Sequence, residues 1–145
     1  MATTASAPVG FEELGEHECL RLLGTAHLGR LALSVGALPA VFPIYFALLG
    51  RDPVFRTDEG TKLAAASSGH VVCLEADDVD VELHSGWSVM VIGSAHVMTD
   101  PDDIATARKL PLRPWVGSGD VYVQIHSGIV TGRRMSGIAP GTRPR

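Results

Sequence analysis

Aromatic side chains are scarce in this sequence of 145 residues, of which only 6% are Phe, Trp or Tyr. Hydrophobic residues still make up 46%, so the core must consist mostly of Leu, Val, Ala and Ile. The net charge of −4 argues against nucleic acid as the main partner, because a phosphate backbone is bound by clustered Lys and Arg. The length suits a single domain.

Cysteine is also rare, and long apolar runs are missing. Cys19 and Cys73 lie in unrelated apolar segments, which predicts buried free thiols and a reducing compartment. No uninterrupted apolar run reaches the roughly 18 residues of a membrane-spanning helix. Met1–Pro8 lacks the charged start and apolar centre of a secretory signal. We therefore expect a cytoplasmic protein without a membrane partner.

The common catalytic motifs are absent as well. The sequence contains no G-x-S-x-G, H-E-x-x-H, C-x-x-C or G-x-G-x-x-G, so nothing supports a serine or cysteine hydrolase. His84, His96 and His126 do not have the spacing of metal ligands and are interpreted as surface or partly buried side chains. We predict no metal site and no catalytic side chain.

Hydrophobic alternation predicts a mostly β protein, a barrel with a few short helices. Turn signals and alternation indicate strands at Leu28–Val35, Leu38–Leu48, Val54–Thr57, His70–Ala76, Val81–His84 with Gly86–Met98, and Asp120–Val130. Helices are expected at Gly10–Leu23, Thr61–Ser68 and from Pro101 to about Leu110. Hairpins dominate, and there is no βαβ rhythm. The domain is expected at 10–135, between a disordered segment 1–9 and a flexible tail 136–145.

Details within the strands add three expectations. Pro39 and Pro43 favour an edge or bulged position for the second strand. Gly93 indicates a bulge or a close approach of another backbone. Asp77–Asp80 is expected to form an acidic turn, for which a solvated loop is a better interpretation than a metal site.

The segment Val54–Lys62 is the first candidate for a functional site. It reads as a strand, then a polar turn, then a helix that begins with Thr61 and Lys62. A helix start offers backbone N–H groups and a positive dipole end, which together with a hydroxyl and an ammonium suit a phosphate group. Thr57 is the better strand ligand, because alternation turns Arg56 to the opposite face. An ordinary capped surface helix is the alternative.

The second candidate is the long apolar strand that begins at Gly86, against which a flat ring could pack. Trp87 is more often a core or interface residue than a cofactor-stacking one, and both interpretations stay open. Ser88 could donate a hydrogen bond to a ring edge or simply occupy a strand end. Together the two candidates suggest a phosphorylated ring cofactor.

Several motifs resemble the pyridoxamine 5′-phosphate oxidase-like family, and within it the flavin-binding branch that includes nitroimidazole-resistance proteins. They follow one another over about residues 12–135 in the order Gly29–Ala32, Leu38–Phe46, Phe55–Lys62, Gly86–Val89 with Gly93, and Thr131–Arg134. The resemblance implies an FMN-binding split barrel that works as a homodimer, with cofactor at the subunit interface.

The resemblance also implies roles for particular residues. Thr61 and Lys62 would bind the FMN phosphate, with Thr57 beside them and Arg56 nearby. The backbone of Pro43, Ile44 and Tyr45 would lie along the isoalloxazine ring. Trp87 and Ser88 would belong to a strand near the cofactor, reaching it across the dimer.

The implied function is that of a flavin-dependent oxidoreductase. It would transfer hydride or electrons between a reduced nicotinamide or deazaflavin donor and a small organic acceptor. Val41–Phe46 lacks the basic residues of true pyridoxamine phosphate oxidases, so oxidation of that vitamin is not expected. The alternatives are a reductase dependent on the 5-deazaflavin coenzyme (factor 420), and a flavin- or haem-binding carrier or redox sensor without turnover. In the haem case His84, His96 or His126 would be the axial ligand.

Overall fold

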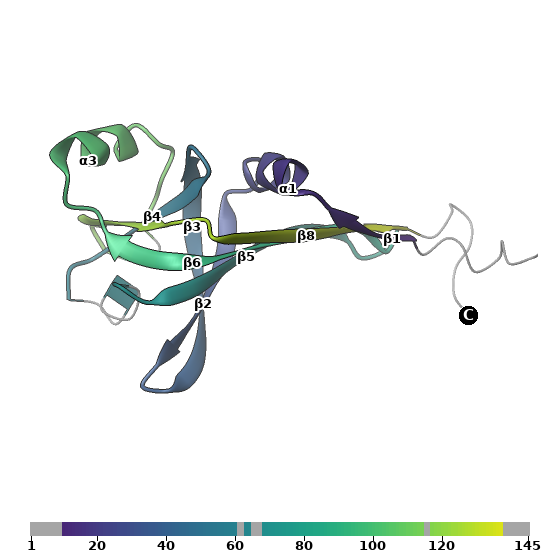
Figure 1. The fold of residues 1–145 in the computed structure, drawn as a ribbon, viewed down its shortest axis with the longest axis horizontal. Coiled ribbons are helices and arrows are strands. Elements are labelled where there is room, and N and C mark those ends of the chain that lie inside the picture. Colours follow the sequence, from purple (N-terminus) through teal and green to yellow (C-terminus); the bar gives the residue numbers. More distant parts are fainter. Residues whose placement is uncertain (1–9, 61–62, 65–67, 115–116, 138–145) are drawn as a thin grey trace, which may run out of the picture.

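The computed structural model describes residues 10–60, 63–64, 68–114 and 117–137. Helices α1 and α3 flank strands in this part of the chain (Figure 1). The elements are β1 Gly10–Leu14, α1 Glu16–Leu23, β2 Leu28–Val35, β3 Leu38–Leu49, β4 Asp52–Thr57, β5 Val71–Asp80, β6 Ser85–Val97, α3 Pro101–Ala107, β7 Val121–Ile125 and β8 Ile129–Ser136.

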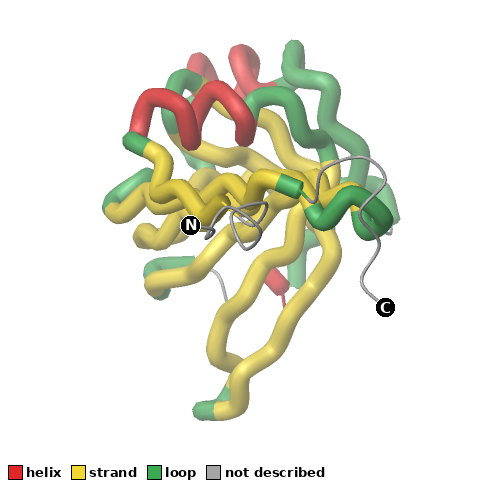
Figure 2. The backbone as a smooth tube through the Cα atoms, turned by 90° about the vertical axis from the view of Figure 1, so that its right-hand side faces the viewer, coloured by secondary structure: helices red, strands yellow, loops and turns green. Residues whose placement is uncertain are grey.

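Strand β6 closes the barrel because it pairs with a different neighbour along each half of one edge. It pairs with β5 throughout, with β8 over residues 86–92, and with β7 over residues 95–97. The strands β6, β5, β2, β3, β4 and β7 thus form a closed antiparallel barrel, and β8 and β1 extend one sheet beyond it. The β2–β3 hairpin projects from the barrel (Figures 1 and 2). The mostly β barrel fold that the sequence predicted is confirmed.

Two apolar clusters hold this arrangement together. The larger fills the barrel and includes the fully buried Leu31, Leu74 and Phe55, and α1 contributes Cys19 and Leu23 to it. The smaller lies under α3 and consists of Val54, Met98, Ala107, Leu112 and Tyr122. None of the helices in the described residues is long and apolar enough to cross a membrane.

The predicted helix Gly10–Leu23 is wrong over its first third. Gly10–Leu14 is a strand that pairs with Gly132–Ser136 of β8, and the helix begins only after Gly15, which has extended backbone angles. Pairing with β8 satisfies backbone groups that an isolated turn of helix would leave to water. The apolar spacing that suggested a helix therefore applies only to Glu16–Leu23.

Around residue 80, a strand stands where the sequence predicted a turn, and a turn stands where it predicted a strand. Asp77–Asp80 continues β5, paired with Ser85–Ser88, so its predicted turn is wrong. The predicted strand Val81–His84 is instead the turn, where the Leu83 N–H donates to Asp80 Oδ1 at 3.0 Å and His84 has a φ of 52°. Asp80 accepts this bond as acidic residues in tight turns commonly do.

The predicted strand Asp120–Val130 is two strands, β7 and β8, because the chain changes partners along β6. A Cβ at Gly93 would collide with the carbonyl oxygen of His126, so only glycine admits the passing backbone. The close approach expected at Gly93 is confirmed. Of the predicted helix Thr61–Ser68, residues 63–64 are helical, whereas 61–62 and 65–67 lie outside the described residues.

Candidate functional site

Strands β3 and β4 are paired along only part of their length. Their pairing runs from Leu49 and Asp52 to Phe46 and Phe55. Before Phe46, β3 pairs with β2, and after Phe55, β4 pairs with β7. We call the place where the two strands part the β3–β4 split. Pro43–Tyr45 and Arg56–Thr57 lie on its two sides, so the fold brings these predicted site residues to one place.

The backbone of β3 is oriented so that alternate residues face the split. The Phe46 N–H donates to the carbonyl oxygen of His27 at 3.0 Å, which turns the even-numbered residues of β3 toward β2. The backbone groups of Pro43 and Tyr45 therefore face the other way, toward the split. Pro39 has the same orientation as Pro43. Neither proline lies where β3 would have to donate a backbone N–H to β2, so the predicted edge position of both prolines is confirmed.

The side chains of the predicted residues are divided between the barrel interior and its surroundings. Ile44 is 2% exposed and belongs to the barrel core, and by the same alternation its backbone faces β2. Thr57 is 6% exposed and is the buried polar side chain of the described residues. Arg56 projects on the opposite side from Thr57, as strand alternation predicted.

Arg56 contacts the loop that precedes β7. Its guanidinium donates to the carbonyl oxygens of Gly119 at 2.9 Å, Ser118 at 3.0 Å and Leu112 at 3.4 Å. The same group lies 5.4 Å from the ring centroid of Tyr122. The hydrogen bonds of Arg56 are thus with backbone oxygens of one loop.

A second group of polar residues lies across the outer face of the sheet. Cross-strand pairing places Pro43 opposite Arg30, and Arg30 opposite Glu75. Asp77 pairs with Ser88 in the next row of the same face. Cross-strand partners project to the same side of a sheet, so Ser88 shares its face with Pro43 and Tyr45.

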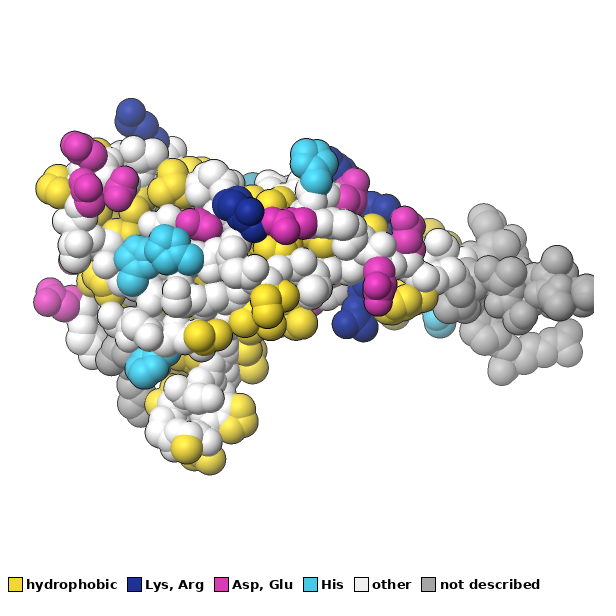
Figure 3. All heavy atoms as spheres, in the orientation of Figure 1, with side chains coloured by type: hydrophobic (Ala, Val, Ile, Leu, Met, Phe, Trp, Pro, Cys, Tyr) yellow, Lys and Arg dark blue, Asp and Glu magenta, His cyan; other side chains and the backbone are white. Residues whose placement is uncertain are grey.

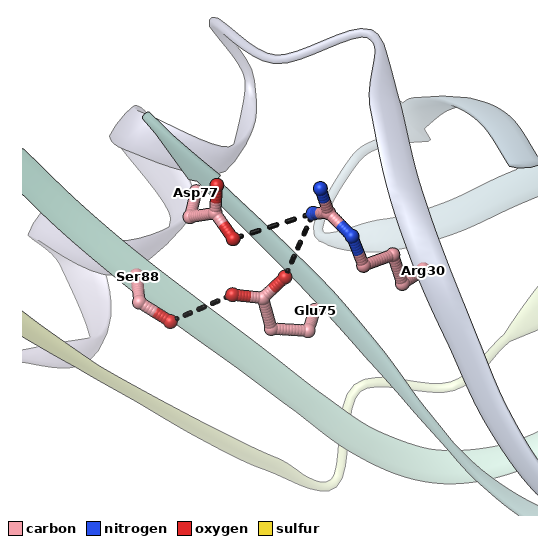
Figure 4. Close-up of polar contacts among 4 residues, drawn as sticks. All are labelled: Arg30, Glu75, Asp77 and Ser88. Atoms are coloured by element: carbon pink, nitrogen blue, oxygen red, sulfur yellow. Dashed lines mark hydrogen bonds and ion pairs between the residues drawn. The ribbon is translucent and has the colours of Figure 1, made fainter. Parts of the chain in front are cut away.

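These residues form a hydrogen-bonded cluster (Figure 4). Ser88 Oγ donates to Glu75 Oε2 at 2.9 Å, and one guanidinium nitrogen of Arg30 lies 3.3 Å from both Glu75 Oε1 and Asp77 Oδ2. Burial, followed by the hydrogen bond with Asp77, raises the pKa of Glu75, while Ser88 and Arg30 act in the opposite direction. One arginine thus faces two carboxylates, so it compensates their charge only in part.

A groove of about 430 Å³ adjoins this cluster between β1, β6 and β8. Ser88 and Met90 of β6, Thr131 and Arg133 of β8, and Phe11 of β1 are among its lining residues. This volume falls within the range of roughly 300–1,000 Å³ found for small-molecule sites. Ser88 is therefore shared by the charged cluster and the groove.

The other predicted residues are placed as follows. Trp87 projects to the opposite side from Ser88 and packs, partly buried, against the barrel core. Thr61 and Lys62 lie outside the described residues. Among the described residues no group of three or more His, Cys, Asp or Glu side chains could hold a metal ion.

Glu75, Asp77 and the groove residues other than Ser88 were missed in the sequence. The signal for the two acids was strand alternation, which carries Cys73, Glu75 and Asp77 to one face if β5 continues past Ala76. The groove had no local signal, because it depends on β1 pairing with β8 at the other end of the chain.

Strands β3 and β4 part at the split, and β6 pairs with β8 and β7 over different residues. This arrangement makes the protein a split β-barrel, the fold of flavin-binding proteins of this class. The sequence profile described as pyridoxamine 5′-phosphate oxidase matches residues 15–134. An uncharacterized protein of Mycobacterium tuberculosis is 37% identical over 129 residues, 85% of this chain and 84% of its own length. This chain belongs to the pyridoxamine 5′-phosphate oxidase family.

Two solved structures are similar over most of the chain. The FAD binding protein from Mycobacterium smegmatis is 40% identical, with a TM-score of 0.75 over 84% of this chain and 96% of its own. A Corynebacterium glutamicum protein provisionally named a pyridoxamine 5′-phosphate oxidase is 33% identical, with a TM-score of 0.76 over 88% of this chain and 99% of its own. The fold and the family predicted from the sequence are thus confirmed.

Proposed function

We propose that this protein binds a flavin nucleotide at the β3–β4 split and uses it as an oxidoreductase. Electrons or hydride would pass between a reduced nicotinamide or deazaflavin donor and a small organic acceptor. The flavin supplies this redox chemistry, and the protein supplies binding and orientation. The observation that carries the proposal is the one-sided pairing of β3, which turns backbone groups of Pro43 and Tyr45 toward the split.

The polar edge of a flavin ring matches such a strand edge. The ring carries both carbonyl oxygens and an N–H, and a strand edge offers donors and acceptors in alternation. Here the backbone of Pro43 and Tyr45 would lie along that edge, with Ile44 holding it in place from the barrel core. The 40% identity to an FAD binding protein supports the same ligand class.

Lys62 and Thr61 remain the residues proposed for the phosphate, on the strength of their sequence alone. Thr57 is proposed to hold the strand end beside them, and Ser88 and Trp87 to stand near the cofactor from β6. FMN is the flavin expected from the sequence. The FAD binding relative makes FAD the second candidate, and the 5-deazaflavin coenzyme the third.

Flavin binding is tested by titrating the apoprotein with riboflavin, FMN, FAD and the 5-deazaflavin coenzyme while flavin fluorescence is recorded. We expect saturable one-to-one binding of FMN or FAD, tighter than that of riboflavin because the phosphate adds contacts. Absence of saturation with every one of these ligands would refute the proposal. Anaerobic reduction of the bound flavin by NADPH or NADH, followed by reoxidation with a nitroaromatic or quinone, tests the enzymatic part.

The phosphate contact is tested separately with Lys62→Met. This variant should weaken FMN binding by about tenfold or more and leave riboflavin binding within about twofold, since one charge-assisted contact contributes on the order of 1.5–3 kcal/mol. Lys109→Met, which removes an exposed lysine from the turn after α3, is the matched control. Equal losses for both ligands would contradict a phosphate role for Lys62.

A homodimer is also proposed, with the outer sheet face as the interface. Leu28, Val41, Val71 and Ile129 are exposed by 43%, 63%, 68% and 58%, and the strand registers place all of them on the face of Arg30. Apolar side chains also gather at the end of the projecting β2–β3 hairpin (Figure 3). Contiguous apolar surface of this kind is typical of an interface.

Light scattering should give twice the 15.3 kDa mass of one chain. The double variant Val41→Glu with Ile129→Glu should give the monomer mass, because it would bury charges between like surfaces. Val81→Glu alters a still more exposed apolar residue in the turn after β5 and should leave the dimer intact. A wild-type monomer at micromolar concentration would refute the dimer.

A second candidate is a flavin carrier or redox sensor without turnover. The same site supports it, because holding a cofactor does not by itself require a substrate. A bound flavin that NADPH and NADH both fail to reduce would establish this alternative. The cytoplasmic location stays a prediction from the sequence.

A further inference from the structure

The loop between α3 and β7 is fastened to β4 from two sides. Arg56 donates to the carbonyl oxygens of Leu112, Ser118 and Gly119. Asp58 accepts from the Gly119 N–H at 2.6 Å and from Ser118 Oγ at 3.1 Å. The cation thus meets carbonyl oxygens and the anion meets donors, so each charge has partners of the complementary kind.

The loop is shaped for this close contact. Gly117 has a φ of 82°, and a Cβ there would collide with the carboxylate of Asp58. Gly119 has a φ of 67°, and a Cβ there would lie 2.7 Å from Pro114 Cβ and 3.2 Å from Arg56 Nε. Both glycines therefore allow a backbone conformation and an approach that other residues would prevent.

The geometry of Arg56 decides between two roles. A guanidinium can bind a phosphate through a pair of parallel N–H donors, and it can do so only where those donors are available. Here Nε and both terminal nitrogens are directed at carbonyl oxygens that lie in one loop. These bonds use three of the five N–H donors of the guanidinium and tie it to the loop, where the Gly119 residue that it holds is buried.

We propose that Arg56 and Asp58 are positioning residues, which fix residues 112–114 and 117–119 of the loop against the end of β4 and so form one wall of the β3–β4 split. In this role Arg56 makes no contact with the cofactor phosphate, contrary to its assignment from the sequence as a binding residue. The loop is held before any ligand arrives, and ligand binding then does not have to order it. This inference rests on the proposed function for its second test below and is independent of it in the first.

The first test is hydrogen exchange of the full-length protein without added flavin. Arg56→Met should speed amide exchange in residues 117–119 and at Leu112 by about tenfold or more, because hydrogen bonds to a charged group contribute on the order of 1.5–3 kcal/mol. Asp58→Ala should do so for the Gly119 amide, whose acceptor it removes. Arg108→Met, a change at an exposed arginine that ends α3, should leave this exchange unchanged.

Arg56→Lys and Ser118→Ala sharpen this test. Lysine keeps the charge and loses the planar fork, so Arg56→Lys should expose the loop nearly as much as Arg56→Met does. Ser118→Ala removes one exposed hydroxyl on the loop side and leaves β4 intact, so it keeps the test valid if the Arg56 variants fail to fold. The proposed positioning role is wrong if amide exchange is unchanged in Ser118→Ala and in those Arg56 variants that fold.

The second test compares FMN with riboflavin. A lost wall should weaken binding of both ligands by the same factor, whereas a lost phosphate contact should weaken FMN alone. We therefore expect equal factors, within about twofold, for Arg56→Met, in contrast to the selective loss expected for Lys62→Met. A loss confined to FMN would overturn the positioning role. If the wild-type protein binds no flavin at all, the proposed function fails. The exchange experiment would still decide whether Arg56 and Asp58 hold the loop.

Discussion

Two arginines on neighbouring parts of the sheet, Arg56 and Arg30, differ in what surrounds their charge. Arg56 is held by backbone carbonyl oxygens, whose positions are fixed by the fold. Arg30 is 53% exposed and contacts the side chains of Glu75 and Asp77 at 3.3 Å each. The first contact is therefore part of the structure, whereas the second consists of side chains that a ligand or a second subunit can rearrange.

The comparison also reverses the roles suggested by proximity in the sequence. Arg56 is next to Thr57 and close to Thr61 and Lys62, which made it a candidate for phosphate binding. Arg30 lies far from them in the sequence, yet pairs directly with Pro43 on the face that also carries Ser88. Arg30 is also the more exposed of the two side chains, so a ligand on that face can reach it more readily than it can reach Arg56.

Arg56→Met should produce the largest loss of stability. We expect the free energy of unfolding to fall by about 2 kcal/mol, because buried backbone groups of the loop lose a charged partner. Urea denaturation of the variant and of the control Arg108→Met measures this difference. A loss below about 0.5 kcal/mol would mean that the loop is held by its apolar contacts, such as that of Leu112 in the cluster under α3.

Arg30→Glu should have a smaller effect that depends on salt. It places a third carboxylate beside Glu75 and Asp77, and we expect a loss of about 1 kcal/mol at low ionic strength, reduced by the exposure of these groups. In about 0.5 M NaCl most of the loss should disappear, whereas the loss in Arg56→Met should persist. Equal salt dependence in the two variants would remove the distinction between the two arginines.

The limits of prediction from the sequence follow the same division between local and distant contacts. The hairpin Leu28–Leu49 and the proline edge were predictable, because alternation and turn residues act within one segment. Strand β1 was not, because Gly10–Leu14 becomes a strand only through pairing with residues more than a hundred positions away. Local propensity was overridden there by a tertiary partner.

The candidate site shows the same pattern. Pro43–Tyr45 and Arg56–Thr57 could be grouped from motifs, and the strand registers do place them on the two sides of one split. The loop that engages Arg56 could not be foreseen, since Gly117 and Gly119 read only as loop residues until Asp58 and Arg56 are placed against them. The cluster of Glu75 and Asp77 was hidden because acidic residues at Asp77–Asp80 suggested a turn.

Glu75→Gln should reveal the partly compensated charge near Arg30 through its pH dependence. The pKa of Glu75 is raised above its ordinary value of 4.5, so the folded state holds this proton more tightly than the unfolded chain does. Glu75 therefore adds stability as pH falls through its raised pKa toward 4.5, and that contribution is lost as pH rises. Glutamine does not titrate, so Glu75→Gln should remove this dependence of stability on pH. The contribution amounts to at most about 1 kcal/mol after solvent screening.

Thermal unfolding measured from pH 7 down to pH 4.5 checks this, with Glu82→Gln, an exposed acid in the turn after β5, as the control. The wild-type protein and the control should share a component of the slope that Glu75→Gln lacks. A variant with the wild-type slope would show that Arg30 and Ser88 compensate Glu75 fully, which would weaken the contrast with Arg56.

His96→Gln should have the smallest effect on stability. The pH dependence of stability that is due to His96 should be opposite in sign to that due to Glu75. The His96 ring stacks on that of His126 with centroids 4.5 Å apart, and burial followed by the charge of His126 lowers the His96 pKa. The unfolded chain then binds this proton more readily, so the folded state loses stability as pH falls through the ordinary value of 6.5. Gln at this position should abolish that loss, which we expect to be a few tenths of a kcal/mol because the ring is partly exposed. In the His96→Gln background the net gain of stability as pH falls from 6.5 to 4.5 should become steeper, because the opposing component of His96 is gone, and an unchanged net slope would show that His96 does not contribute to it.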